Sequence, residues 1–187
     1  TSRRQRQMCI RDRDTSLQNA VTATTAASVA VCKAIEKLTD LKPKIKWVND
    51  VYLNGKKVCG ILTEATTDFE SGIVDSVIIG IGINISTTKF PGDVEGAGCL
   101  DVDINRSALI AETVNELMNI AGGDYASFIE YYRSHSMVIG EKIKFIQNGK
   151  TTFATALAID ERGGLEVGLE SGEKTVLRSG EITVRKV

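Results

Sequence analysis

The stretch KIKWVNDVYLNGKKVCGILTE, residues 44–64, decides how the middle of the chain folds. Two strand-like runs flank Asn54-Gly55, a dipeptide that supplies the positive φ angles of a type I′ turn. The stretch therefore predicts a β-hairpin closed by a two-residue turn. Extended along both strands, this register predicts the following cross-strand pairs: Leu53 with Lys56, Tyr52 with Lys57, Asp50 with Cys59, and Asn49 with Gly60.

The polar side chains of this hairpin divide between its two faces. Side chains alternate along a strand, so the same register gives two sets: Lys46, Asp50 and Lys57 on one face, and Trp47, Asn49 and Gly60 on the other. If Asn49 and Lys57 bind one ligand, the strand must be bulged or broken near Val48 or Asn49. Lysines in a hairpin are also typical of a solvated sheet edge, and that interpretation stays open.

A nearly continuous apolar strand follows, VDSVIIGIGINIS at residues 74–86. Alternation puts its valine and isoleucines at 77, 79, 81, 83 and 85 on one face and leaves Gly80, Gly82 and Asn84 on the other. Glycines inside a strand weaken it, so the bare face predicts the close approach of a ligand or of another backbone. A helix packed closely on the sheet is the alternative.

Helical periodicity and turn signals order the rest of the chain. Apolar stripes predict three helices: one from a Thr15 or Ser16 cap to Leu38, one starting at Asn105 or Ser107, and one from Asp124 to His135. Beyond Gly140, short alternating segments separated by glycine-containing turns predict a five-stranded barrel. We therefore expect two domains, residues 14–139 and 140–187, with a boundary near residue 139.

Composition excludes several classes of function. The 187 residues carry 23 basic and 24 acidic side chains, so no overall charge favours nucleic acid or a membrane surface. No apolar run is long enough to span a bilayer, and no signal peptide is evident, which predicts a cytoplasmic protein. The cysteines lack a Cys-x-x-Cys spacing and His135 is the only histidine, which argues against a zinc site. We expect His135 at the surface or at a helix end.

The first thirteen residues, TSRRQRQMCIRDR, differ from the rest of the chain. They hold five arginines without glycine or a periodic apolar face. The string resembles the translated adapter sequence that contaminates some assembled genes, so we interpret residues 1–13 as a non-native leader. A basic arm that binds nucleic acid is the alternative.

Three motifs together carry a family resemblance. KWVND at 46–50, KVCGILTE at 57–64 and GIGIN at 80–84 resemble, in order and spacing, the biotin protein ligase signature KWPND, K-x-x-G-I-L-x-E and G-x-G-I-N. The closing SGEITVR at 179–185 also resembles that family, and Val48 departs from its usual proline. The resemblance implies an α/β (α+β) fold: a mixed β-sheet with flanking helices, of the class II synthetase-like type, followed by a small SH3-like barrel.

The resemblance also implies a reaction. Biotin protein ligases join the biotin carboxylate to the α-phosphate of ATP with Mg²⁺ present, then pass biotin from biotinyl-AMP to a lysine of a biotin carboxyl carrier protein. Two anions must meet, so cationic donors have to offset their repulsion. The implied catalytic residues are Lys57, Lys46 and Asp50, although a structural hydrogen bond to the turn is an equal interpretation for Asp50. The implied substrate-binding residues are Lys57, Gly60, Ile61, Asn49, Gly80, Gly82, Asn84 and Glu181, with Asn84 near the phosphate or metal.

Two family elements have no counterpart in the sequence. A Gly-Arg loop of the form GRGRxGR and a Ser-Thr-Asn biotin segment normally precede the first helix, and neither is present. That loop shields a reactive anhydride from water. We therefore expect an N-terminally truncated ligase that is weak or inactive. DNA binding is not supported, and the family favours a homodimer through the central sheet. A lipoate ligase and a noncatalytic SH3-like module that binds peptide or RNA are the alternatives.

Overall fold

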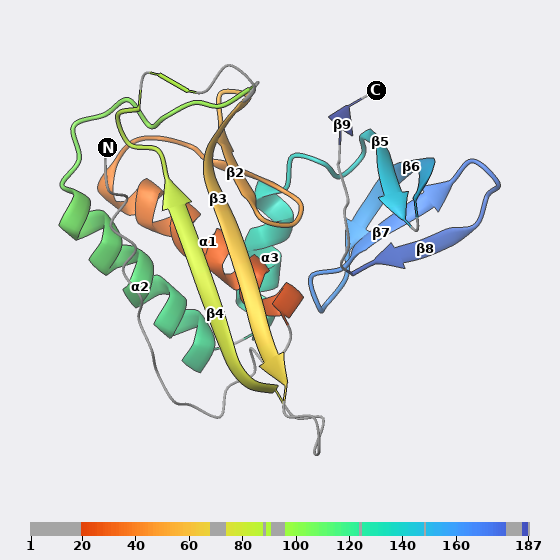
Figure 1. Ribbon diagram of the computed structural model, residues 1–187, viewed down its shortest axis with the longest axis horizontal. Coiled ribbons are helices and arrows are strands. Elements are labelled where there is room, and N and C mark those ends of the chain that lie inside the picture. Colours follow the sequence, from red (N-terminus) through yellow and green to blue (C-terminus); the bar gives the residue numbers. More distant parts are fainter. Residues whose placement is uncertain are drawn as a thin grey trace.

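The computed structural model describes residues 20–67, 74–87, 89–90, 96–123, 125–147, 149–178 and 185–186. In this part of the chain three helices accompany two antiparallel sheets (Figure 1). The helices are α1 (Ala20–Leu38), α2 (Arg106–Gly122) and α3 (Tyr125–His135). The first sheet holds β1 (Lys44–Lys46), β2 (Asp50–Leu53), β3 (Lys56–Thr67) and β4 (Val74–Ile83). The second holds β5 (Lys142–Gln147), β6 (Lys150–Ile159), β7 (Leu165–Leu169), β8 (Lys174–Leu177) and β9 (Arg185–Lys186).

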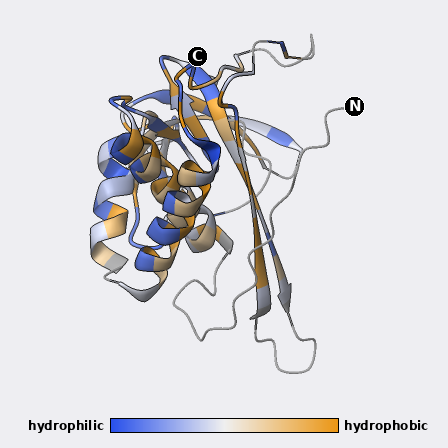
Figure 2. Ribbon diagram, turned by 90° about the vertical axis from the view of Figure 1, so that its left-hand side faces the viewer, coloured by the Kyte–Doolittle hydropathy of each residue, from blue (hydrophilic) through white to orange (hydrophobic). Residues whose placement is uncertain are grey.

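The first sheet has the order β1-β2-β3-β4, and every neighbouring pair is antiparallel. The expected mixed sheet is therefore wrong for the described strands, where parallel pairing is confined to the isolated bridges Ile45–Ser136 and Lys57–Ala97. Figure 1 shows α1 behind the long β3–β4 hairpin, with α2 and α3 on either side of it. Figure 2, turned by 90°, shows the helices on one side of that hairpin.

Helix α1 is the centre of the core. Its residues from Ala23 to Ile35 are buried almost throughout, and small or β-branched side chains let the helix lie close to the sheet. Two buried hydroxyls, on Thr25 and Ser28, donate to the carbonyls of Thr22 and Thr24, which satisfies them inside the helix. The predicted caps Thr15 and Ser16 lie outside the described residues.

The other two predicted helices are present. Asn105 caps α2, and its side chain accepts from the Ala108 N–H at 3.1 Å, as an N-cap residue does. Helix α3 ends at His135, whose ring stacks on Tyr131 at 3.9 Å between centroids. His135 is therefore a helix-end residue, as predicted, while Asp124 lies outside the described residues. No described helix combines the length and the apolar character that crossing a membrane requires.

The hairpin around Asn54-Gly55 forms with one change of register. Leu53 pairs with Lys56 and Tyr52 with Lys57, as predicted. Beyond them Val51 pairs with Cys59 and Asp50 with Gly60, because Val58 is an extra residue in β3. The predicted pairs Asp50–Cys59 and Asn49–Gly60 are therefore wrong. Val58 is fully buried, so its burial in the core favours the bulge over an unbroken ladder.

The predicted break in the preceding strand is confirmed. β1 ends at Lys46 and β2 begins at Asp50, so Trp47, Val48 and Asn49 form a turn between them. The Trp47–Val48 peptide bond is cis.

The second sheet has the order β8-β7-β6-β5-β9 and is antiparallel throughout. Its five strands agree with the number predicted beyond Gly140. Among the described residues no pairing joins β8 to β9, so the described strands do not close into a barrel.

Candidate ligand site on the open face of the first sheet

An ion pair between β2 and β3 marks the site. Lys57 Nζ lies 2.5 Å from Asp50 Oδ1, with the lysine side chain 41% and the aspartate side chain 18% exposed. Oδ1 is itself buried and has no hydrogen bond of good angle within the described residues, so the Lys57 ammonium supplies its charge balance. A buried carboxylate oxygen without its cation is unfavourable, so Asp50 holds the Lys57 ammonium at this position.

Gly60 lies under this ion pair. A Cβ placed on Gly60 would be 3.2 Å from Lys57 Cε, 3.4 Å from Lys57 Nζ and 3.9 Å from Asp50 Oδ1. The expected placement of Gly60 on the opposite face is therefore wrong. The extra residue Val58 reverses the alternation between Lys57 and Gly60, and so brings both to the face that carries Asp50.

Lys46 and Tyr52 extend the site along β1 and β2. Lys46 pairs with Asp50 across the strands, and its Nζ lies 5.5 Å from the centroid of the Tyr52 ring. Burial, with a smaller contribution from Asp50, raises the pKa of Tyr52, so its hydroxyl stays protonated and able to donate. Sequence reasoning missed Tyr52, although its place two residues after Asp50 puts both on one face.

A bare strip of backbone continues from the ion pair. Gly60 pairs with Gly82 and Leu62 with Gly80, and both strand glycines are exposed. A Cβ on Gly80 would meet only Leu62 atoms, at 3.6 Å or more, and one on Gly82 only the Gly60 carbonyl oxygen, at 3.8 Å. No described element covers this strip, which we call the glycine window (Gly60, Gly80 and Gly82). The alternative of a closely packed helix is therefore wrong for the described residues.

The opposite face of β4 packs on the core, as its sequence predicts. The side chains at 77, 79, 81, 83 and 85 are partly buried against the core residues. β4 thus turns its apolar side toward the helices and its glycines outward.

Asn49 fixes the strand break against β3. Its Nδ2 donates to the Ile61 carbonyl at 2.9 Å, and the Ile61 N–H donates back to the Asn49 carbonyl at 2.9 Å. The Ile61 side chain is buried, so only its backbone faces the site. The structure thus brings Asn49 to the edge of the glycine window through the backbone of Ile61, beside the ion pair.

Asn84 helps to hold the loop at Gly96–Gly98 against the backbone of Lys57. Asn84 Nδ2 donates to the Gly98 carbonyl at 3.0 Å, while the Gly98 N–H donates to the Lys57 carbonyl at 2.9 Å. The Lys57 N–H donates to the Gly96 carbonyl at 2.8 Å. A Cβ on Gly98 would lie 2.7 Å from Lys56 Cβ, so this close approach requires glycine. Neither glycine was assigned to the site from the sequence.

Two further properties of the described residues are their capacity to bind a metal and the reactivity of the cysteine at the site. No cluster of three or more His, Cys, Asp or Glu side chains there could hold a metal ion. Cys59 lies beneath the site, and burial raises its pKa to about 12, which keeps it a thiol. Glu181 lies outside the described residues.

Two family models match separate parts of the chain. Residues 7–84 match the Biotin/lipoate A/B protein ligase family, and residues 138–185 match the biotin protein ligase C terminal domain. The chain is similar to the bifunctional ligase/repressor BirA of Bacillus subtilis, at 30% identity over 174 residues that cover 87% of the chain and 53% of the relative. The biotin--[acetyl-CoA-carboxylase] ligase of Mycobacterium tuberculosis is 26% identical over 176 residues, 84% of the chain and 60% of the relative.

Solved structures agree on the fold. The biotin protein ligase from Aquifex aeolicus in complex with biotin and ATP aligns with a TM-score of 0.74 at 24% identity, covering 91% of this chain and 74% of that one. The chain spans about half the length of the BirA protein it matches, 53%. The motifs, the fold and both family models agree, and the chain belongs to the biotin protein ligase family.

Proposed function

We propose that the protein is a biotin protein ligase. In the first step a biotin carboxylate oxygen attacks the α-phosphorus of ATP, and pyrophosphate leaves. In the second, a carrier lysine amine attacks the carbonyl of biotinyl-AMP, and AMP leaves. The observation that carries the proposal is the Lys57–Asp50 ion pair beside the glycine window, because it offers a cation and an open backbone surface to an elongated anionic ligand.

Lys57 is the proposed electrostatic centre of both steps. Its ammonium is half exposed and reaches over Gly60, so it can turn from Asp50 to the biotin carboxylate and then to the adenylate linkage. A charge-assisted contact of this kind contributes about 1.5 to 3 kcal/mol. When Lys57 moves to the adenylate, Asp50 Oδ1 is left to accept the proton of the incoming amine.

Lys46, Asn49 and Asn84 are proposed to face the nucleotide phosphates. Lys46 lies on the same face as Asp50, and Asn49 stands at the break beside it. Asn84 Nδ2 donates to the Gly98 carbonyl, and its amide oxygen is of the type that Mg²⁺ takes as a ligand. Mg²⁺ carried by ATP would neutralise phosphate charge. Glu181 is proposed to complete the nucleotide site from the C-terminal region.

We further propose two domains, residues 14–139 and 140–187, the second closing as an SH3-like barrel. The five antiparallel strands and the match of residues 138–185 to a C-terminal ligase domain support this proposal. The proposed assembly is a homodimer through the first sheet, acting in the cytoplasm on a biotin carboxyl carrier protein.

Calorimetric titration of the full chain with a non-hydrolysable biotinyl-adenylate tests the site. We expect weak binding that Lys57→Ala abolishes and Lys56→Ala preserves, because Lys56 is the adjacent lysine on the other face of β3. Equal binding by all three proteins would refute the role of Lys57. A lipoyl-adenylate competitor separates the two ligase classes, since the family model covers both biotin and lipoate ligases.

Transfer is tested with biotin, ATP, Mg²⁺ and a carrier domain, using the chain alone and the chain preceded by a Gly-Arg loop segment from a relative. We expect rapid biotinylation only in the second case, because that loop shields the anhydride from water. Ordinary turnover by the chain alone would contradict the expected weak activity.

A further inference from the structure

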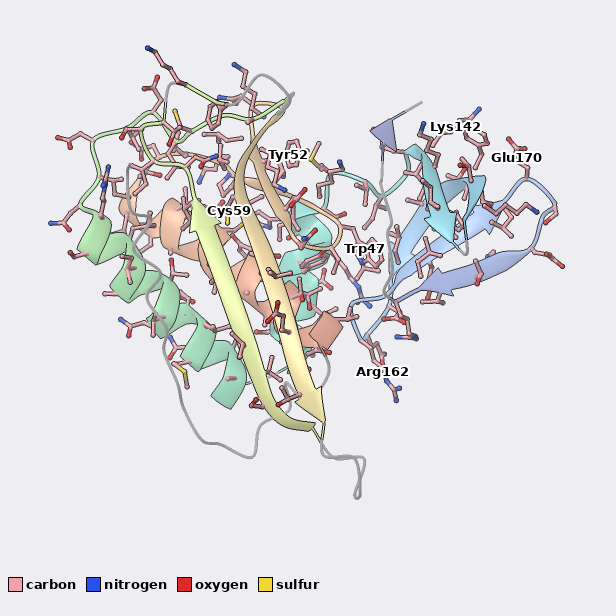
Figure 3. All side chains as sticks on the ribbon, in the orientation of Figure 1. Trp47, Tyr52, Cys59, Lys142, Arg162 and Glu170 are labelled. Atoms are coloured by element: carbon pink, nitrogen blue, oxygen red, sulfur yellow. The ribbon has the colours of Figure 1, made fainter. Side chains whose placement is uncertain are left out.

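A buried hydrogen bond joins the two sheets next to the site. Trp47 is only 4% exposed, and its indole Nε1–H donates to the Gly163 carbonyl at 2.8 Å. Trp47 is the first residue of the break between β1 and β2, whereas Gly163 belongs to the turn between β6 and β7. Figure 3 shows Trp47 between the first sheet and the second, with Arg162 of that turn on the side of the second sheet.

The turn that presents this carbonyl is rigidly built. Asp160 Oδ1 accepts from the Arg162 N–H at 2.7 Å and from the Gly164 N–H at 2.8 Å. Arg178, the residue after β8, donates to the other carboxylate oxygen, Asp160 Oδ2, at 2.7 Å. Gly163 itself adopts a φ of 80°, in the left-handed region that favours glycine. The Gly163 carbonyl is therefore held at a fixed position.

The same glycine is pressed against α1. A Cβ on Gly163 would lie 2.9 Å from Thr25 Cγ2 and 3.1 Å from Thr25 Oγ1. Thr25 is fully buried and donates to the Thr22 carbonyl at 2.9 Å, so it has little freedom to move aside. Any side chain at position 163 must therefore displace the turn.

The chain that leaves Trp47 leads straight to the ligand site. The Val48 carbonyl accepts from Tyr132 Oη at 3.3 Å and from Ser28 Oγ at 3.4 Å. Asn49 follows and exchanges two hydrogen bonds with Ile61. Four elements thus hydrogen-bond to the break among the described residues: α1, α3, β3 and the Gly163 turn. Of these, the Gly163 turn is the one from the C-terminal region.

A second hydrogen bond ties the C-terminal region to α3, the helix that carries Tyr132. Arg133 Nε, next to Tyr132 in α3, donates to the Ile159 carbonyl at 2.8 Å, at the end of β6. The Gly163 turn is thereby anchored to α3 as well as to α1, and its displacement would be felt at Val48 and Asn49.

We propose that the Gly163 turn is a positioning element for the ligand site, acting through the Trp47 indole. The second sheet would set the place of Asn49 and Asp50 without touching the ligand. Trp47 and Gly163 are positioning residues, and Thr25 is the wall that fixes the turn. This inference rests on the proposed adenylate site.

The test combines binding with amide exchange. Trp47→Phe removes the indole donor but keeps an aromatic ring, and Gly163→Ala pushes the turn away from Thr25. We expect each to weaken binding of the biotinyl-adenylate analogue about 10-fold, as the loss of a buried hydrogen bond predicts. The Ile61 amide, which donates to Asn49, should exchange faster in both variants.

A rescue variant separates positioning from general damage. Thr25→Ala removes both atoms that crowd position 163 and leaves Thr25 Cβ at an acceptable 3.6 Å, so Thr25→Ala/Gly163→Ala should recover most of the affinity. Thr25→Ala alone is the reference for the double variant, because it measures what loss of the Thr25 side chain costs by itself. If Gly163→Ala does not fold, Trp47→Phe carries the test.

The outcomes distinguish the two proposals. Suppose that Lys57→Ala loses binding, while folded Trp47→Phe and Gly163→Ala keep both the affinity and the Ile61 exchange rate of the unmodified chain. That result would overturn the positioning role and leave the proposed adenylate site standing. If no protein binds the analogue, the proposed function fails, and the Ile61 exchange still decides whether the turn holds Asn49.

Discussion

A methyl group on Gly60 would lie 3.2 Å from Cε of Lys57, so the backbone of Gly60 is the surface on which the lysine side chain rests. This contact is tighter than ordinary van der Waals packing, and the flexible lysine is the partner that can yield. The position of the ammonium beside Asp50 therefore depends on the absence of a side chain at residue 60.

Gly60→Ala should shift Lys57 away from Asp50 and weaken binding of the biotinyl-adenylate analogue by about 10-fold, which corresponds to about 1.4 kcal/mol. The free energy of unfolding should fall as well, because Asp50 Oδ1 is buried and the ammonium beside it moves away. Titration calorimetry and urea unfolding measure the two effects. A Gly60→Ala protein with native affinity would show that Lys57 does not need its present position.

Gly82→Val should change stability and binding in opposite directions. A Cβ at residue 82 meets only the Gly60 carbonyl oxygen, at 3.8 Å, so the strand accepts the side chain. Replacing a strand glycine by a β-branched residue stabilises by about 0.5 to 1 kcal/mol. The same side chain fills the glycine window, so the adenylate analogue should no longer bind.

Ser76→Thr is the matched control for Gly82→Val. It adds a methyl group to an exposed position of β4 beyond the glycine window, where Ser76 and Thr66 hydroxyls already meet at 2.6 Å. Affinity should be unchanged in this variant. Retained binding in Gly82→Val, measured by the same titration, would place the ligand elsewhere.

The hairpin shows what local sequence predicts and what it does not. Asn54-Gly55 predicted the turn and the two pairs next to it, because the φ angles of those residues fix the first pairs. The bulge at Val58 was missed because it depends on burying that side chain in the core, which is a tertiary effect. Gly60 was therefore predicted on the wrong face. Tyr52 was missed as a site residue, although strand alternation places it on the same face as Asp50.

The loop from Gly96 to Leu100 was beyond sequence reasoning for a similar reason. Its place beside Lys57 depends on hydrogen bonds between residues far apart in the chain, and no periodicity records them. The exposed glycines of β4 were predictable, since alternation alone assigns Gly80 and Gly82 to one face.

Asn84→Ala should loosen that loop. The substitution removes the bond to the Gly98 carbonyl, and a lost hydrogen bond of this kind costs about 0.5 to 1.5 kcal/mol. The Gly98 amide, which donates to the Lys57 carbonyl, should exchange faster with solvent, as mass spectrometry or NMR would detect. Asn105→Ala, which removes the α2 cap, is the control: it should lower stability without changing exchange at Gly98 selectively. Equal Gly98 exchange in the Asn84 variant would mean that the backbone bonds alone hold the loop.

Alkaline pH should destabilise the protein through Cys59. Burial raises the pKa of this thiol from 9.0 to about 12, so the unfolded chain releases the proton at lower pH than the folded chain. The contribution is fully present below pH 9 and is lost as pH rises from about 9 toward about 12. Between pH 8 and pH 10 the loss from Cys59 is about 1 kcal/mol, and urea unfolding at both values measures it. Cys59→Ala should reduce the difference between the two pH values by about that amount, whereas Val51→Ala, a buried change that removes no proton, should preserve it. The same pH dependence in both variants would show that Cys59 ionises in the folded protein as readily as in the unfolded chain.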